Sequence, residues 1–157
     1  IYDENLANYF PAAIEGGAVV RDSVVGRGCV IQGKVERSVL FPGVRVAPGA
    51  HVVDSVIMPD CIIGQEAHIN RCIVDKASVI DMGCRVGNPY AEVHNSEFPD
   101  LLNSGISLIG EKVLLPPGSR VGGNVLMYPG LKPQQMHGNE FHDGTTVSSG
   151  ALTKSEN

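Results

Sequence analysis

Small and aliphatic residues alternate with a short period through most of the chain. From residue 38 to residue 87, a small or compact residue is followed two positions later by an aliphatic one, and the pattern returns every five or six residues. The pairs are Ser38/Leu40, Val44/Val46, Ala50/Val52, Ser55/Ile57, Cys61/Ile63, Ala67/Ile69, Cys72/Val74, Ser78/Ile80 and Cys84/Val86. Hexapeptide repeats of this kind are typical of a left-handed parallel β-helix, in which three short strands form each triangular coil. The sequence therefore predicts an all-β fold, with the aliphatic residues at its centre.

The repeat sets the expected boundaries of the helix. It begins at Ser23/Val25 and has one shortened coil around residues 33–36, after which equivalent positions lie 17 residues apart. At residue 88 the register breaks, and a loop over residues 88–106 leaves the helix before Ser107/Ile109 resumes the pattern. We therefore expect five to six coils over residues 23–133, with one inserted loop.

The two ends lack the repeat. Residues 1–22 are expected to be a lead-in or linker from a missing upstream domain, because the chain opens on Ile1 without a methionine. Residues 134–157 are expected to be a polar C-terminal tail. The sequence is thus predicted to be one β-helix domain of a longer protein.

Stacking the coils predicts which residues point outward in rows. One face carries a basic row, His51, His68, Arg85 and Arg120, and another carries Val30, Arg45, Ile62, Val79 and Leu114. The third face carries only apolar residues, Val24, Val39, Val56, Ile73, Leu108 and Leu126. A sheet that is apolar on both sides usually has something packed on it. We therefore predict that Val39, Val56, Ile73 and Leu108 lie at a domain or subunit interface.

Composition narrows the possible partners and the compartment. A net charge of −5 argues against nucleic acid, and no apolar run is long enough for a membrane span. The four cysteines form no Cys-x-x-Cys pair, and each occupies a small inward position of the repeat. They are expected to be buried free thiols, which favours a reducing, cytoplasmic location.

Few residues suggest catalysis. The chain has no nucleophile elbow, no glycine-rich phosphate loop and no HExxH motif, so no catalytic residue is predicted. His137 and His142 lie in the polar tail and are not expected to bind a metal. His51 and His68 fit either an anion or acyl-carrier site or a solvated polar face, and the polar face is favoured.

Charged residues at two corners of the coil are also candidates. Asp22, Arg37, Asp54 and Arg71 occupy equivalent positions with alternating sign, which predicts a charge ladder. Lys76 stands at a corner where the two preceding coils have proline. It could bind an anion or pair with Asp75.

Residues 20–87 resemble the C-terminal β-helix of glucose-1-phosphate adenylyltransferase. The similar stretches are SVVGRGCVIQGKVERSVLFPGVRV, which includes the shortened coil, and RCIVDKASVIDMGCRVG. The segment SGISLIGEKVLLPPGSRVG is similar to further coils in related sugar-phosphate nucleotidyltransferases. The insertion at residues 88–106 departs from the bacterial pattern.

The resemblance implies a parent enzyme that joins ATP and glucose 1-phosphate, releasing pyrophosphate and supplying ADP-glucose for glycogen or starch. Its catalytic site, with ATP and Mg²⁺, would lie in an upstream domain, so this domain would hold no cofactor and be inactive alone. The β-helix would pack on that domain, help form a tetramer and bind an anionic sugar-phosphate effector. Lys76 and Arg71 match the basic effector positions.

Other functions remain open. The main alternative is a free-standing trimeric acyltransferase that uses acyl-CoA, with His51 or His68 as the base. A non-catalytic regulatory paralogue and a purely structural β-helix are further possibilities.

Overall fold

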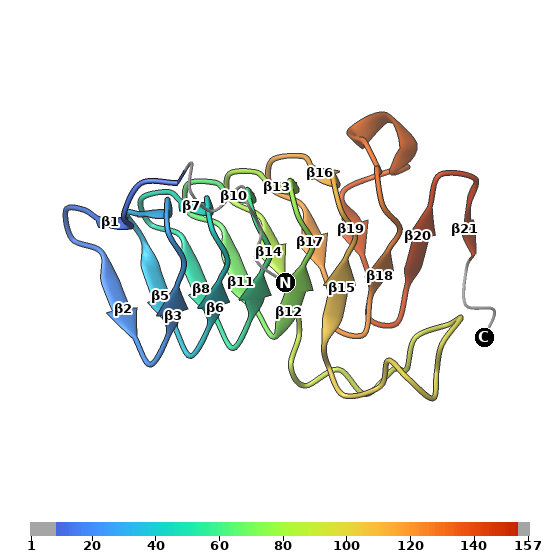
Figure 1. Cartoon of the computed structure of the whole chain (residues 1–157). Coiled ribbons are helices and arrows are strands. Elements are labelled where there is room, and N and C mark those ends of the chain that lie inside the picture. The colour runs from blue at the N-terminus through green and yellow to red at the C-terminus, as the bar shows by residue number, and fades with distance from the viewer. Residues whose placement is uncertain (1–8, 154–157) are drawn as a thin grey trace.

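The computed structural model describes residues 9–153, and the side chains of residues 9–150. This part of the chain is a parallel β-helix whose coils follow one another along the length of the molecule (Figure 1). From β1 to β20, consecutive strands belong to different sheets, and each strand pairs with its equivalents one coil away. The prediction of an all-β, left-handed parallel β-helix is therefore confirmed.

The three sheets are called faces A, B and C. Face A contains, in spatial order, β1 (Ala13–Ile14), β4 (Val30–Ile31), β7 (Arg45–Val46), β10 (Ile62–Ile63), β13 (Val79–Ile80) and β16 (Leu114–Leu115). Face B contains β2 (Val19–Arg21), β5 (Lys34–Glu36), β8 (His51–Val53), β11 (His68–Asn70), β14 (Arg85–Val86), β17 (Arg120–Val121) and β19 (Glu140–Phe141). Face C contains β3 (Val24–Val25), β6 (Val39–Leu40), β9 (Val56–Ile57), β12 (Cys72–Val74), β15 (Ser107–Ile109), β18 (Leu126–Met127), β20 (Thr146–Ser148) and β21 (Ala151–Thr153). Only β21 among these runs antiparallel to its neighbour, and the 3₁₀ helix η2 (Pro133–Gln135) lies between β18 and β19.

The core is a column of aliphatic side chains at the inward positions. On β10, Ile63 is fully buried whereas the preceding Ile62 is 44% exposed, because successive side chains of a strand point to opposite sides. The aliphatic positions of the repeat are buried throughout: Leu40, Val46, Val52, Ile57, Ile63, Ile69, Val74, Ile80, Val86, Ile109, Leu115 and Val121. Burying each such side chain stabilises the fold by about 1.5–3 kcal/mol before conformational entropy is counted.

The corner before face C explains why serine recurs at the small position. Arg37 has a φ of 44°, so the chain turns sharply there through the left-handed region. On the next coil, the N–H of Ser55 donates to Ser38 Oγ at 3.1 Å, and Ser38 Oγ donates to the carbonyl of Glu36 at 2.7 Å. The same link joins Ser38 to Ser23 Oγ and Cys72 to Ser55 Oγ. A serine hydroxyl thus satisfies a backbone N–H that lies one coil farther along.

The four cysteines are buried free thiols, as predicted. The thiols of Cys61 and Cys72 donate to the backbone carbonyls of Asp75 and Asn70, at 3.0 and 3.2 Å. Burial raises the pKa of Cys61 to about 11 and that of Cys72 to about 12. Both thiols are protonated at neutral pH and therefore pack as small hydrophobic groups rather than react as thiolates.

The inserted loop is confirmed, and the helix resumes in register after it. No strand or helix occurs between β14 and β15. Beyond the loop, face by face, the Cα partners are Ile73 with Leu108, Val79 with Leu114, and Arg85 with Arg120. The insertion therefore projects from a continuous helix.

A buried asparagine holds the insertion against the helix. Asn95 is 1% exposed, and its Nδ2 donates to the backbone carbonyl of Asn124 at 3.0 Å. Its Oδ1 accepts the N–H groups of Glu97 and Phe98, each at 3.0 Å. Asn124 Nδ2 in turn donates to the carbonyl of Val93 at 2.9 Å. These bonds make the insertion a fixed wall beside the last coils.

The helix extends farther at both ends than the pattern predicts. Strands β1 and β2 lie within residues 1–22, and β19, β20 and β21 lie within residues 134–157. Faces B and C, with seven and eight strands, therefore exceed the five to six coils expected. At the N-terminal end, Ala12/Ile14 and Ala18/Val20 continue the repeat and are the signal that the prediction overlooked. In the C-terminal coil, moreover, Phe141 takes the inward position in place of an aliphatic residue.

The in-and-out pattern of β10 provides a test of the core. Ile63→Ala should lower the free energy of unfolding by about 2–5 kcal/mol, because it leaves a cavity in a closely packed column. Ile62→Ala is the matched control and should change it by no more than about 0.5 kcal/mol, since that side chain lies on the surface. Urea denaturation followed by circular dichroism measures both, and equal effects would contradict the assigned register.

Candidate functional site

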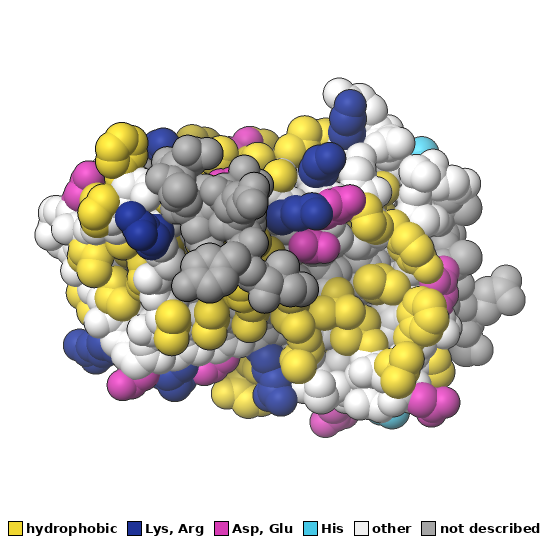
Figure 2. All heavy atoms as spheres, in the orientation of Figure 1, with side chains coloured by type: hydrophobic (Ala, Val, Ile, Leu, Met, Phe, Trp, Pro, Cys, Tyr) yellow, Lys and Arg dark blue, Asp and Glu magenta, His cyan; other side chains and the backbone are white. Residues whose placement is uncertain are grey.

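The predicted interface residues form one continuous row on face C. Val24, Val39, Val56, Ile73, Leu108 and Leu126 are Cα partners from coil to coil, so their side chains stack along the outer surface. Val24 is 64% exposed and Ile73 is 39% exposed. Figure 2 shows hydrophobic side chains gathered along the side of the molecule that faces the viewer. The face C row is thus a continuous apolar strip that runs along the helix axis across six strands.

The C-terminal end of the face C row opens into an apolar hollow of about 520 Å³. Its lining comes from the row, from β9 and β18 with their turns, and from the insertion, and includes Met58, Ile73, Phe98, Leu108 and Tyr128. Tyr128 Oη donates to Glu97 Oε2 at 3.0 Å, which ties the last coils to the insertion. Phe98 lies in the insertion, outside the hexapeptide pattern, so the pattern carries no signal for this hollow.

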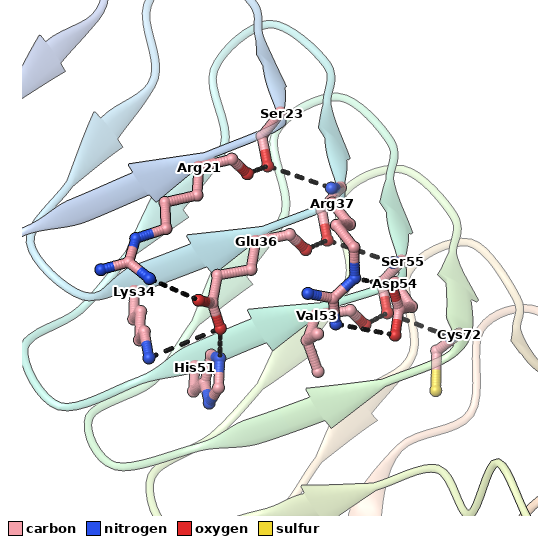
Figure 3. Close-up of polar contacts among 11 residues, drawn as sticks. Arg21, Ser23, Lys34, Glu36, Arg37, His51, Val53, Asp54, Ser55 and Cys72 are labelled. Atoms are coloured by element: carbon pink, nitrogen blue, oxygen red, sulfur yellow. Dashed lines mark hydrogen bonds and ion pairs between the residues drawn. The ribbon is translucent and has the colours of Figure 1, made fainter.

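The predicted charge ladder forms one ion pair. Arg37 and Asp54 meet through two contacts, Nε to Oδ1 at 2.6 Å and Nη2 to Oδ2 at 3.1 Å (Figure 3). The hydrogen bond from Arg37 lowers the pKa of Asp54. Both side chains are about half exposed, so the pair contributes only about 0–1 kcal/mol. All four ladder residues have positive φ: Asp22, Arg37, Asp54 and Arg71.

Arg71 lies at a second hollow, of about 560 Å³. Its lining includes Arg37, Asp54, Asn70, Arg71 and Tyr90. Among the described residues, Arg71 has no ion pair, and the buried Oδ1 of Asn70 has no hydrogen-bond partner. The hollow therefore offers a free guanidinium beside an unsatisfied polar atom. Its use as an effector site stays a prediction.

Lys76 has a partner that the sequence did not suggest. Its Nζ lies 3.4 Å from Glu111 Oε2 on the next coil, while its backbone N–H donates to Asp75 Oδ1 at 2.7 Å. The predicted ammonium pairing with Asp75 is therefore replaced by a pairing with Glu111, which follows the insertion in sequence. The Lys76 side chain remains 60% exposed. Lys76 and Arg71 stand at opposite ends of β12, and Lys76 does not line the Arg71 hollow.

At the N-terminal end of face B, a single carboxylate contacts three basic side chains. Glu36 Oε2 lies 2.8 Å from His51 Nε2 and 3.5 Å from Lys34 Nζ, and Glu36 Oε1 lies 3.9 Å from Arg21 Nη1 (Figure 3). The Glu36 side chain is only 14% exposed. The hydrogen bond with His51 is the largest cause of a lowered pKa at Glu36. This part of the basic row is electrically compensated.

The two candidate histidines stack but differ in environment. The ring centroids of His51 and His68 are 5.9 Å apart in an edge-to-face arrangement. His51 is held by Glu36, whereas burial, and then the charge of Arg85, lower the pKa of His68. Arg85 and Arg120, at the end of the same row, line a hollow, and neither His51 nor His68 lines it.

Metal-binding and membrane-spanning features were sought in the described residues. Over residues 9–153, no group of three or more His, Cys, Asp or Glu side chains is placed to hold a metal ion. Within the same residues, no helix is long and apolar enough to cross a membrane.

Comparison with curated proteins finds glucose-1-phosphate adenylyltransferases. The protein of Acetivibrio thermocellus is 36% identical over 135 residues, covering 86% of this chain and 32% of that protein. The protein of Thermomicrobium roseum is 41% identical over 139 residues, covering 88% and 32%. That of Bacillus mycoides is 46% identical over 83 residues, covering 53% and 22%. The chain thus spans about a third or less of the length of these relatives.

Solved structures with a similar arrangement are acetyltransferases. GDP-perosamine N-acetyltransferase from Caulobacter crescentus matches with a TM-score of 0.47 and 16% identity, over 94% of this chain and 58% of that one. The acetyltransferase domain of PglB from Neisseria gonorrhoeae matches with a TM-score of 0.28 and 22% identity, over 88% and 54%. At these values the likeness says nothing about activity.

The family itself follows from the repeat. A family model described as "GlmU-like, C-terminal hexapeptide" matches residues 7–109, which include the shortened coil, the regular coils, the insertion and β15. This match covers more than half of the chain, and its boundaries agree with the strands described above. The chain belongs to the family of GlmU-like C-terminal hexapeptide domains.

Proposed function

We propose that the chain is the regulatory and oligomerisation β-helix of a sugar-1-phosphate nucleotidyltransferase. The parent reaction is the conversion of ATP and glucose 1-phosphate to ADP-glucose and pyrophosphate, in glycogen or starch synthesis. The observation that carries this proposal is the similarity to glucose-1-phosphate adenylyltransferases over 86–88% of the chain. ATP and Mg²⁺ would bind in an upstream catalytic domain, so no residue of this chain is assigned to them.

The face C row supports a role in assembly. A row of apolar side chains that is open to solvent on a β-helix needs a covering surface. In the proposed parent, this surface is the catalytic domain or a second subunit of a tetramer. The apolar hollow beside Phe98 and Tyr128 would receive a side chain from that surface. The buried, unreactive thiols favour the cytoplasm as the compartment.

Lys76 and Arg71 are proposed to bind an anionic sugar-phosphate effector. Arg71 has a free guanidinium within the described residues, and the Lys76 ammonium is exposed. Because Glu111 already pairs with Lys76, an incoming anion would compete with this carboxylate. Such competition favours a multiply charged effector over a singly charged one.

The first test concerns the chain alone. The isolated 157-residue chain should form no detectable ADP-glucose from ATP and glucose 1-phosphate, because the nucleotide site lies outside it. A radiometric assay of ADP-glucose checks this, with the longer protein as the positive control. Synthesis by the isolated chain would contradict the proposal. Acyl-CoA cleavage that disappears in His51→Ala or His68→Ala would instead favour an acyltransferase.

The second test concerns the face C row. Val56→Asp in the longer protein should shift the sedimentation profile to smaller species, because a carboxylate would be buried without a partner at the interface. Ile62→Asp is the matched control, since it places the same charge at an outward position of face A. An unchanged profile for Val56→Asp, or an equal shift for both variants, would show that the face C row is not part of the assembly surface.

The third test concerns the effector. Lys76→Glu should raise the sugar-phosphate concentration needed for half-maximal activation by about tenfold or more, because a charge-assisted contact becomes a repulsion. Lys132→Glu, another lysine-to-glutamate change in the last coils, should leave activation unaltered. Activation curves measured at fixed substrate compare them. If both variants keep the parental curve, Lys76 does not contact the effector.

A further inference from the structure

Two arginines on face B lie one above the other, and neither forms an ion pair with a described residue. Arg85 on β14 and Arg120 on β17 are Cα partners, so their backbones are about 4.8 Å apart. Both are exposed, and neither forms an ion pair with any described residue. Like charges directly opposite one another on adjacent strands are destabilising. The pair is therefore electrostatically incomplete.

The same row shows how the chain otherwise handles stacked cations. Three coils earlier, Lys34 and His51 are also neighbours in register, but Glu36 lies between them and contacts both. Arg85 has no such carboxylate, whereas Arg120 has Glu140 as its Cα partner on β19, although the two form no ion pair. The charge of Arg85 also acts on the neighbouring strand β11, where it contributes to the lowered pKa of His68. The uncompensated charge is thus confined to the C-terminal half of face B.

The two guanidinium-bearing residues line a hollow of about 560 Å³. Its other walls come from the start of the insertion, through Asn88 and Val93, and from the last coil, through His142. This volume lies in the range of about 300–1,000 Å³ that is usual for small-molecule sites. The cations therefore face a concave space formed by segments that are distant in sequence.

The walls of this hollow are fixed by hydrogen bonds. Asp143 Oδ1 accepts the N–H of Gly123 at 2.8 Å, and Asp143 Oδ2 accepts Asn88 Nδ2 at 3.1 Å. This carboxylate is thus committed to holding the insertion against the last coil. Gly87 begins the insertion with a φ of 100°, and a Cβ there would meet the carbonyl of Asn70. The hollow is preorganised by residues other than the two arginines.

Of the two carboxylates that line the hollow, Asp143 accepts only from amide N–H groups and Glu140 has no side-chain partner among the described residues. Glu140 is the Cα partner of Arg120 and also lines the hollow, yet it forms no ion pair within the described residues. A ligand here must therefore present an anion to the arginines and a hydrogen-bond donor to Glu140. A phosphate ester that also carries hydroxyl groups has both features.

We propose that Arg85 and Arg120 form a binding site for a phosphate-bearing small molecule, with His142 beside it as a further polar contact. Guanidinium groups bind phosphate oxygens in a bidentate manner, and two of them one strand apart match a dianion or a diphosphate. The site is separate from Arg71 and Lys76, because neither of these lines the hollow. The proposal therefore does not depend on the proposed function.

Titration with inorganic phosphate and with inorganic pyrophosphate tests the site. Both probes should raise the melting temperature of the protein in low salt, and pyrophosphate should do so at lower concentration because it reaches both cations. The double variant Arg85→Gln/Arg120→Gln should weaken pyrophosphate binding by about tenfold or more. Arg45→Gln, an exposed arginine between Val30 and Ile62 on face A, is the matched control and should bind as the parent does.

Further measurements locate the bound anion. Histidine NMR signals should shift for His142 and not for His137 during the titration. Without probe, the double variant should melt close to the parent, since it loses the repulsion between the arginines together with the attraction of Arg120 to Glu140. The variant Arg85→Lys/Arg120→Lys keeps the charge and should bind with intermediate affinity.

Three outcomes would overturn the proposal. The first is the absence of any pyrophosphate-dependent stabilisation in the parent protein. The second is equal affinity in the parent and in Arg85→Gln/Arg120→Gln. The third is loss of pyrophosphate binding in Lys76→Glu while Arg85→Gln/Arg120→Gln still binds. That result would place the anion at Lys76 instead, and it would not contradict the proposed function.

Discussion

Parallel backbone pairing between coils is the constraint on which the rest of the structure depends. Each strand bonds to its equivalent one coil away, usually 17 residues distant in sequence, so equivalent residues must stack. A change of one residue in coil length would turn the core outward, since side chains alternate along a strand. The chain therefore absorbs its irregularities at corners: one coil is two residues shorter, and the insertion leaves and returns between strands. The outward residues of each face therefore stack in the same register as the core.

Stacking also turns single charges into rows, and the rows need compensation. Near the N-terminal end the chain provides it, with Glu36 beside Lys34 and His51, and with Asp54 beside Arg37. Toward the C-terminal end of face B, the arginines lack a partner within the described residues. The face C row likewise leaves apolar side chains, such as Val24 and Ile73, exposed among the described residues. The hollow at Arg85 and Arg120 thus lies apart from the face C row, whereas the Arg71 hollow adjoins that row through Val56 and Ile73.

The sequence predicted the regular part of the fold well because the repeat is itself the fold. It identified the inward residues, the buried cysteines, the outward rows and the resumption after the insertion, all of which follow from register. It could not identify contacts that depend on the path of the insertion. The pairing of Lys76 with Glu111, the anchoring by Asn95 and the hollow beside Phe98 join segments with no shared period. The strands at the C-terminal end were missed for a different reason, since Phe141 replaces an aliphatic residue at the inward position there.

Because of the serine links at the corner before face C, the loss of a hydroxyl on one coil affects the coil that follows it. Ser38 Oγ bonds to its own coil through the carbonyl of Glu36, but it accepts the N–H of Ser55 on the next coil. Removing this hydroxyl would leave a buried donor unpaired one coil farther toward the C-terminus, at a cost of about 1–3 kcal/mol. Loss of a corner serine is therefore felt mainly by the coil that follows it, whereas loss of a core side chain affects the coils on both sides.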